Sequence, residues 1–274
     1  PILDTPHPDT PASDGALDNS LVCKQPDTAI IMDDTLWNNS NDILSDDIQI
    51  DTGAKLTVAA GLQIDNINFL VQGTLVIAGN ATSPVHLKNS TIELSKDSST
   101  PGILDIQHAV ITNSAVTGRG YGRFSIRDSK FRNVAGFYIW YPQSGSEFIR
   151  NTVEDSGGLS VGVSCGSGGL RIENNVFVRP TTAYAIKNWA HYSQDCLIVK
   201  NNSFLDASEI HLQDGYDDTY IDAGENYWGT NIECRIQERI KDRNDSLTMP
   251  SIINYEPILD TPHPDTPASD GALD

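Results

Sequence analysis

The sequence predicts an all-β fold in which short strands stack into successive coils. Apolar pairs five residues apart recur along the chain, at Ile106 and Ile111, Ile126 and Phe131, Phe148 and Val153, Ile172 and Phe177, Val199 and Phe204, and Ala223 and Trp228. Neighbouring pairs are 20 to 27 residues apart, a period typical of repeat folds in which each turn buries its apolar face against the next. The segments are short, alternate apolar with polar residues and are rich in Asn, Gly, Ser and Val, which excludes helical repeats.

A second regularity is an asparagine three residues after the first member of four of these pairs. These are Asn151, Asn175, Asn202 and Asn226. Amides stacked in one column can bond from turn to turn and satisfy backbone groups at a tight bend. We therefore assign these asparagines a structural role, beside an interior aromatic stack formed by Phe131, Phe177, Phe204 and Trp228.

The two ends of the stack have their own patterns. Residues 29–50, which include Trp37, are expected to form the N-terminal cap and first strand, because an open coil end is a sheet edge that needs a cover. After Trp228, the pair Thr230 and Glu233 has the spacing of a capping box, and isoleucines follow at helical intervals. The sequence predicts a capping helix over about residues 231–243.

Several motifs carry a family resemblance that covers roughly residues 30–260. The runs LTVAAGLQI and LVQGTLVIAGNATSPVHL, the ENN-type coils and the ending ENYWGT resemble secreted bacterial right-handed parallel β-helix proteins with pectin-lyase-like coils. The resemblance implies a right-handed, single-stranded parallel β-helix with a short C-terminal capping helix and a last strand matched by residues 251–259. It leaves the activity open, because the same fold carries lyases, hydrolases, epimerases and inert stalks.

The first 18 residues, PILDTPHPDTPASDGALD, recur letter for letter as residues 257–274. This identity predicts tandem copies with a period of 256 residues, so that neighbouring copies are expected partners. Alternating Pro, Asp and Thr favour an extended spacer of about 3.1 Å per residue. We divide the chain into a linker at 1–18, which is the tail of a preceding copy, a β-helix domain at 19–256, and the last-strand end with the repeated linker at 257–274.

Composition excludes some partners. The formal net charge of −19 argues against nucleic acid, which needs a basic footprint, and against adsorption to anionic membranes. No apolar run approaches the roughly 18 residues that span a bilayer. With the family resemblance, these features favour a secreted or cell-surface protein, cut from a larger precursor.

The four cysteines, Cys23, Cys165, Cys196 and Cys234, lack a CxxC spacing, which argues against a zinc site or a thioredoxin-like motif. We favour a disulfide between Cys165 and Cys196, because both border the longest coil. A bond from Cys234 to Cys23 of the next copy is a further hypothesis.

The strand that precedes each repeated motif offers the best candidate ligand surface. Alternation is expected to turn Phe137, Ile139, Val161, Val163, Tyr184, Ile186, Ile210 and Leu212 inward. It then turns outward Tyr138, Trp140, Lys187, Glu209 and His211. Aromatic rings beside a cation and a carboxylate on a flat sheet suit a sugar chain, with Lys187, Glu209 and His211 as the candidate catalytic groups. The alternative is that these are scattered exposed residues.

Charge distribution and metal ligands give two weaker hypotheses. The segment from Arg119 to Lys200 contains ten basic and six acidic residues. This local positive excess could attract an anionic polysaccharide, or the charges could form solvated pairs between coils. Asp214, Asp217 and Asp218 are the best oxygen donors for calcium, although no DxDxDG spacing is present. No compact acidic cluster resembles the calcium site of the family.

Two functions follow from these patterns. The first is a non-catalytic extracellular module of adhesin type that extends a larger protein and binds glycans, especially anionic ones, along its middle coils. The alternative is a polysaccharide-active enzyme, a lyase or glycoside hydrolase, acting on an acidic polysaccharide along the same coils.

Overall fold

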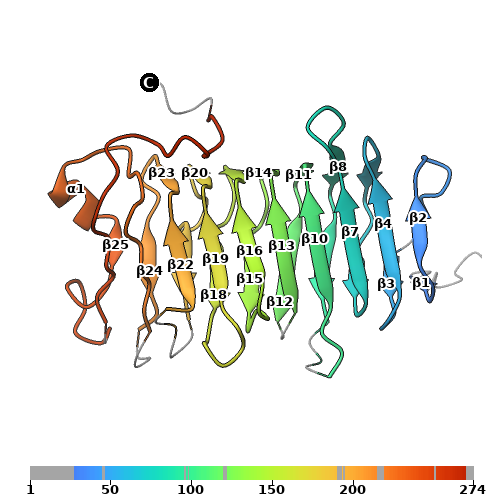
Figure 1. Cartoon of the computed structure of the whole chain (residues 1–274), viewed down its shortest axis with the longest axis horizontal. Coiled ribbons are helices and arrows are strands. Elements are labelled where there is room, and N and C mark those ends of the chain that lie inside the picture. The colour runs from blue at the N-terminus through green and yellow to red at the C-terminus, as the bar shows by residue number, and fades with distance from the viewer. Residues whose placement is uncertain are drawn as a thin grey trace, which may run out of the picture.

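The computed structural model describes residues 28–44, 47–95, 97, 99–119, 122–189, 193, 195–214, 219–249 and 251–269. Over these residues the chain forms an all-parallel β-solenoid whose coils follow one another along a single axis (Figure 1). Each complete coil contributes one strand to each of three sheets, which we call sheets A, B and C. The predicted all-β stacked fold is confirmed.

Among the described residues, sheets A, B and C hold ten, eight and seven strands. Sheet A consists of β1 (Thr28–Ile31), β3 (Asp47–Ile50), β6 (Phe69–Val71), β9 (Thr91–Leu94), β12 (Ala115–Arg119), β15 (Phe137–Trp140), β18 (Leu159–Gly162), β21 (Ile186–Asn188), β24 (Ile210–Leu212) and β25 (Ile240–Lys241). Sheet B consists of β2 (Thr35–Trp37), β4 (Lys55–Ala59), β7 (Thr74–Ala78), β10 (Ile103–Gln107), β13 (Arg123–Arg127), β16 (Ser146–Ile149), β19 (Leu170–Glu173) and β22 (Leu197–Lys200). Sheet C consists of β5 (Gln63–Asp65), β8 (Val85–Lys88), β11 (Ala109–Thr112), β14 (Lys130–Arg132), β17 (Thr152–Glu154), β20 (Val176–Val178) and β23 (Ser203–Leu205).

The strand register agrees with the period found in the sequence. In sheet B the first members of the apolar pairs pair directly, in the order Ile106, Ile126, Phe148, Ile172 and Val199. In sheet C the second members do the same, in the order Ile111, Phe131, Val153, Phe177 and Phe204. All of these side chains are buried, so each coil seals its apolar face against its neighbours.

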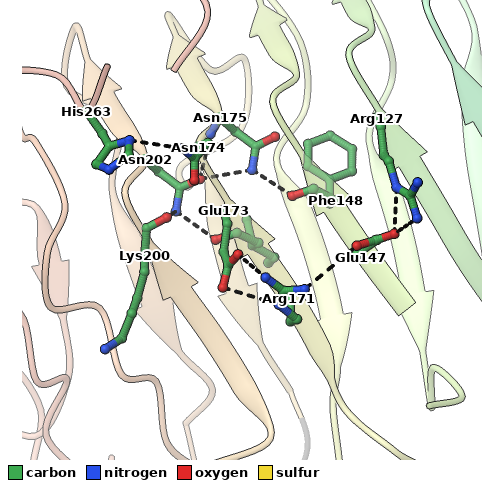
Figure 2. Close-up of polar contacts among 11 residues, drawn as sticks. Arg127, Glu147, Phe148, Arg171, Glu173, Asn174, Asn175, Lys200, Asn202 and His263 are labelled. Atoms are coloured by element: carbon green, nitrogen blue, oxygen red, sulfur yellow. Dashed lines mark hydrogen bonds and ion pairs between the residues drawn. The ribbon is translucent and has the colours of Figure 1, made fainter. Parts of the chain in front are cut away.

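The asparagine column is an unbroken ladder of buried amides at the bend between sheets B and C. The side-chain oxygens of Asn175, Asn202 and Asn226 accept from the backbone N–H of the ladder residue one coil earlier, at 2.8–2.9 Å. Their amide groups also donate to backbone carbonyls, as Figure 2 shows for the bond from Asn175 to Phe148. The predicted structural role is confirmed.

Backbone conformation fixes this bend. The residue before each ladder asparagine has a positive φ, 53° at Arg150, 58° at Asn174, 57° at Asn201 and 58° at Glu225. Because the left-handed region reverses the local curvature, the chain turns sharply there and aims the next side chain into the stack. The four residues form a second column on the outside of the bend.

The predicted aromatic stack holds at its C-terminal end. The rings of Phe177 and Phe204 stack at 5.3 Å, and those of Phe204 and Trp228 at 4.9 Å. Val153 lies between Phe131 and Phe177 in the column, so the Phe131 ring packs instead against Phe148 and Phe137. Phe131 therefore belongs to the column but is not stacked on the other three rings.

The predicted capping helix is too long. The structure has only α1 (Glu233–Gln237), and the Thr230 hydroxyl accepts from the Ile232 N–H rather than completing a capping box. Ile240 pairs with Ile210, and the Ile210 N–H donates to the Arg239 carbonyl at 2.9 Å. Because β25 uses residues 240–241 to extend sheet A, the helix ends before them.

The structure also places the cysteines and the C-terminal repeat. Cys165 and Cys196 form the disulfide that the sequence favours, and Cys234 is an exposed free thiol. Cys23 and the linker at residues 1–18 lie outside the described residues, whereas residues 257–269 are described and lie along the stack. No helix in the described part of the chain has the length and apolar character needed to cross a membrane.

Candidate functional site

The outer face of sheet A carries one row of side chains that crosses all its central strands. Strand register places them in the order Gln49, Leu70, Glu93, Thr117, Tyr138, Ser160, Lys187, His211 and Lys241. The residues on either side of this row, such as Phe137, Ile139, Ile186 and Leu212, are fully buried. The outward placement predicted for Tyr138, Lys187 and His211 is confirmed.

Aromatic rings gather at the C-terminal half of this face. Trp140 lies on β15 and Trp189 follows β21, and their ring centroids are 6.4 Å apart. Gly162 is the partner of Trp140 on the intervening strand β18, and a β-carbon there would lie 3.0 Å from Cδ2 of Trp140. Glycine at this position therefore lets the Trp140 ring lie across the strand toward Trp189.

Lys187 connects the tryptophans to a second aromatic group. Its ammonium nitrogen lies 4.3 Å from the centroid of the Trp189 ring and 5.9 Å from that of Tyr184, within the range of cation–π attraction. Burial lowers the pKa of Lys187 below its usual value, and the charge of Asp214 offsets part of that effect. The amine is therefore more easily deprotonated than an exposed lysine.

His211 and Glu209 form the next contact along the face. His211 Nε2 lies 2.7 Å from Glu209 Oε2, and the His211 ring is 5.7 Å from that of Tyr184. Burial lowers the pKa of His211, although the hydrogen bond and charge of Glu209 act in the opposite direction. The neutral imidazole thus donates from Nε2 to the carboxylate and keeps Nδ1 as a basic nitrogen.

The predicted inward position of Tyr184 is wrong. The backbone N–H groups of Ala185 and Ile186 both point to the Glu209 carbonyl, at 2.8 Å and 3.4 Å. This bulge puts two consecutive residues, Ala185 and Ile186, into the core, so the alternation shifts by one and Tyr184 faces outward. The error adds an aromatic ring to the candidate surface.

Sequence reasoning also missed Trp189 and Gly162. Trp189 is two residues after Lys187, so extending the alternation one step beyond the strand would have found it. Gly162 offered no comparable signal, because its role depends on the pairing of β15 with β18. The resulting aromatic band comprises Tyr138, Trp140, Tyr184, Lys187, Trp189, Glu209 and His211.

The basic residues of the middle coils are mostly engaged in ion pairs. In the described part of the chain, Arg127, Arg132, Arg150, Arg171, Arg179 and Lys200 each lie within 4.0 Å of a carboxylate. Figure 2 shows one such series on sheet B, in which Arg171 lies between Glu147 and Glu173. The solvated-pair interpretation of the local charge excess is therefore the one that the structure favours.

The calcium hypothesis rests largely on residues that the structure does not describe. Asp217 and Asp218 lie outside the described residues, and the Asp214 carboxylate accepts a 2.8 Å hydrogen bond from the Thr248 hydroxyl. Among the described residues, no group of three or more His, Cys, Asp or Glu side chains is arranged to hold a metal ion.

Comparison of the chain with protein-family models, with curated proteins and with solved structures gave no match. The functional argument therefore rests on the geometry of the aromatic band.

Proposed function

We propose that the chain is a repeat module of a secreted or cell-surface bacterial protein of adhesin type, and that it binds a glycan along the outer face of sheet A. In this proposal the solenoid is a right-handed, pectin-lyase-like parallel β-helix. The aromatic band is the single observation that carries the binding function. Its rings and polar groups come from β15, β21 and β24 or from residues next to these strands.

The spacing of the coils suits a linear polymer. Neighbouring strands are roughly 4.8 Å apart, and the band runs along the solenoid axis from β15, which carries Trp140, past β18 to β21, which Tyr184 and Trp189 flank, and to β24, which carries His211. Flat aromatic faces with a few polar groups at fixed positions are the usual lining of a ligand site. A chain of sugar rings lying along the axis would stack on the band and meet Lys187 and His211 toward its C-terminal end.

Charge favours an acidic glycan over a neutral one. The cations Lys187 and Lys241 lie on either side of the neutral His211 in the row, and the Lys187 ammonium lies against aromatic rings. A carboxylate or sulfate of a bound sugar would supply a charge partner to this ammonium. Half-buried charge pairs are weakened by salt less than exposed ones.

The experiment is a binding titration of the whole chain with acidic and neutral oligosaccharides, read by calorimetry. We expect acidic oligosaccharides to bind, and Trp140→Ala, Trp189→Ala and Lys187→Ala each to weaken binding at least tenfold. Leu70→Ala is the matched control, because Leu70 is exposed on the same row of sheet A but lies away from the band. Gly162→Val keeps every aromatic residue but displaces the Trp140 ring, and should also weaken binding.

If the band variants and the Leu70→Ala control bound acidic oligosaccharides with equal affinity, the aromatic band would not be the glycan-binding site. Absence of binding across an array of acidic and neutral glycans would overturn the binding function, and would leave a purely structural module.

A polysaccharide lyase or hydrolase is the second candidate. The specific observation in its favour is the depressed pKa of Lys187 beside the His211 and Glu209 pair, since a lysine that loses its proton easily is a suitable general base. An unsaturated uronate product, detected by ultraviolet absorbance and lost in Lys187→Ala or His211→Ala, would establish a lyase. Binding without product would exclude it for the substrates tested.

The tandem-copy proposal has an independent basis in the identical segments at residues 1–18 and 257–274. The test is the coding sequence on either side of the chain. It should continue with a further copy of the domain, and an unrelated sequence on both sides would refute the proposal.

A further inference from the structure

Residues 257–269, which we call the strap, run back along the outside of the stack from its last coil. Ile258 forms a parallel bridge with Asn226, and the Leu259 N–H donates to the Asn226 carbonyl at 3.0 Å. The strap then turns toward earlier coils and passes beside the edge where β23 and β20 lie (Figure 1). Its end, at Ala268 and Ser269, reaches a groove at β14 and β17.

Two specific side-chain contacts hold the middle of the strap. His263 Nδ1 lies 3.1 Å from the amide nitrogen of Asn174 (Figure 2), and the Thr266 hydroxyl donates to the Asn201 carbonyl at 2.9 Å. Both partners belong to the column of positive-φ residues outside the asparagine ladder. A tight turn within the strap, closed by the Thr266 N–H on the His263 carbonyl at 2.9 Å, presents the two side chains to neighbouring coils.

Charge and shape complement these contacts. The hydrogen bond to Asp128 raises the pKa of Arg150 above its usual value, and the strap residue Asp265 adds to that rise. The groove at the end of the strap has a volume of about 250 Å³, and its lining includes Lys130, Arg132 and Glu154, of which the last two form an ion pair. The acidic, proline-rich strap thus lies against a surface that carries Lys130, Arg132 and Arg150, and the two arginines are also paired with carboxylates of the solenoid.

The sequence of the strap occurs a second time in the chain. Residues 1–13 are identical to residues 257–269, so that Leu3, His7 and Thr10 correspond to Leu259, His263 and Thr266. Any surface that recognises one copy by these side chains will recognise the other. We propose that the surface under the strap is a docking site for the segment PILDTPHPDTPAS, and that residues 1–13 of one chain take the place of the strap at this site on a second copy of the chain.

The direction of the strap gives this docking a structural consequence. The strap leaves the last coil and runs toward the middle coils, so a copy joined through it lies beside the first solenoid and not beyond its end. An undocked polyproline-like segment would instead separate the copies, at about 3.1 Å per residue. This inference is independent of glycan binding, because the strap contacts described above, with Asn174, Asn201 and Asn226 and at the groove, involve no residue of the aromatic band.

The first test uses the full chain with His7→Ala, Thr10→Ala, His263→Ala and Thr266→Ala, in which both internal copies of the segment are weakened. The probe is a fluorescent synthetic peptide with the sequence of residues 1–18, and the readout is fluorescence anisotropy. We expect saturable binding that weakens at least tenfold when the peptide carries alanine at positions 7 and 10, or when the chain also carries Arg150→Ala. No saturable binding, or equal binding of both peptides, overturns the proposal.

The second test identifies which chain supplies the segment. The full chain carries His7→Cys, Asn174→Cys, His263→Ala and Thr266→Ala, with Cys23 and Cys234 replaced by serine, and is oxidised mildly before separation without reductant. We expect a 7–174 disulfide that joins two chains, located by mass spectrometry, and a matched chain with Asp18→Cys in place of His7→Cys should link far less. Links only within single chains, or no links, overturn docking on a second copy.

Discussion

Replacing Asn202 with alanine tests the amide ladder most directly, because this residue has ladder neighbours on both sides. Its oxygen accepts from the backbone N–H of Asn175 at 2.9 Å, and its amide donates to the Ile172 carbonyl at 2.8 Å. Both Asn175 and Asn202 are fully buried. The Asn202→Ala change therefore removes the acceptor of the buried Asn175 N–H and one of the two acceptors of the Asn175 side-chain amide, and it takes a donor from the Ile172 and Lys200 carbonyls.

The expected cost follows from these losses. An orphaned buried N–H costs about 1–3 kcal/mol, the lost hydrogen bonds to carbonyls about 1 kcal/mol, and the cavity left by the carboxamide about 1 kcal/mol. The free energy of unfolding should fall by about 3–5 kcal/mol. At about 2–4 °C per kcal/mol for a domain of this size, Tm should fall by roughly 6–20 °C.

The assay is urea unfolding followed by circular dichroism, with a thermal melt as a second reading. Asn201→Gly is the matched control, because Asn201 adjoins Asn202 in the chain, has a φ of 57° that glycine adopts without strain, and uses its backbone carbonyl in the strap contact. The control should change stability by less than about 1 kcal/mol. If Asn202→Ala cost no more than the control, the ladder would not stabilise the bend.

Three further changes test the core, the disulfide and the band. Phe177→Ala removes a ring stacked on Phe204 and should cost about 3–5 kcal/mol; a thermal melt like that of the exposed-site variant Leu70→Ala would refute the stack. Replacing Cys165 and Cys196 by serine opens a loop with a separation of 31 residues and should lower the free energy of unfolding by about 3–4 kcal/mol through loop entropy. If adding reductant to the parent chain left its urea unfolding unchanged, this prediction would be refuted. Burial lowers the pKa of His211, so on acidification the unfolded chain binds this proton before the folded chain does, and stability should fall as pH drops below about 6.5. The urea midpoints at pH 7 and 5.5 should therefore differ less in His211→Gln than in the parent chain. An equal difference in both chains would contradict the assigned burial.

The coil period and the amide ladder could be predicted because they depend on residues that repeat at fixed positions. Each ladder asparagine lies three residues after a buried apolar residue, and a bend that needs a buried acceptor selects the same side chain in each coil. The Cys165–Cys196 bond was predicted for a similar reason, since both residues border one long coil. Local pattern was sufficient in these cases because the partners lie one coil apart.

Features that depend on competition between distant segments could not be predicted. The pattern at residues 231–243 is helical, yet pairing of Ile240 with Ile210 ends the helix early. The bulge at Ala185 that turns Tyr184 outward depends on the Glu209 carbonyl two dozen residues away. The strap has the composition of a spacer, and its contact between His263 and Asn174 joins residues 89 positions apart.

The strap and the aromatic band use different sides of the solenoid, and this separation links the two proposals. Strap contacts come from the bend between sheets B and C and from sheet C, whereas the band lies on the outer face of sheet A. Docking of the segment at the strap surface would therefore not cover the band of the same solenoid. If docked copies lie side by side, their bands are held at short separation, so a long glycan that spans two bands gains affinity through effective concentration. The four-alanine variant that weakens both strap copies should then lose avidity for long glycans while keeping its affinity for short oligosaccharides.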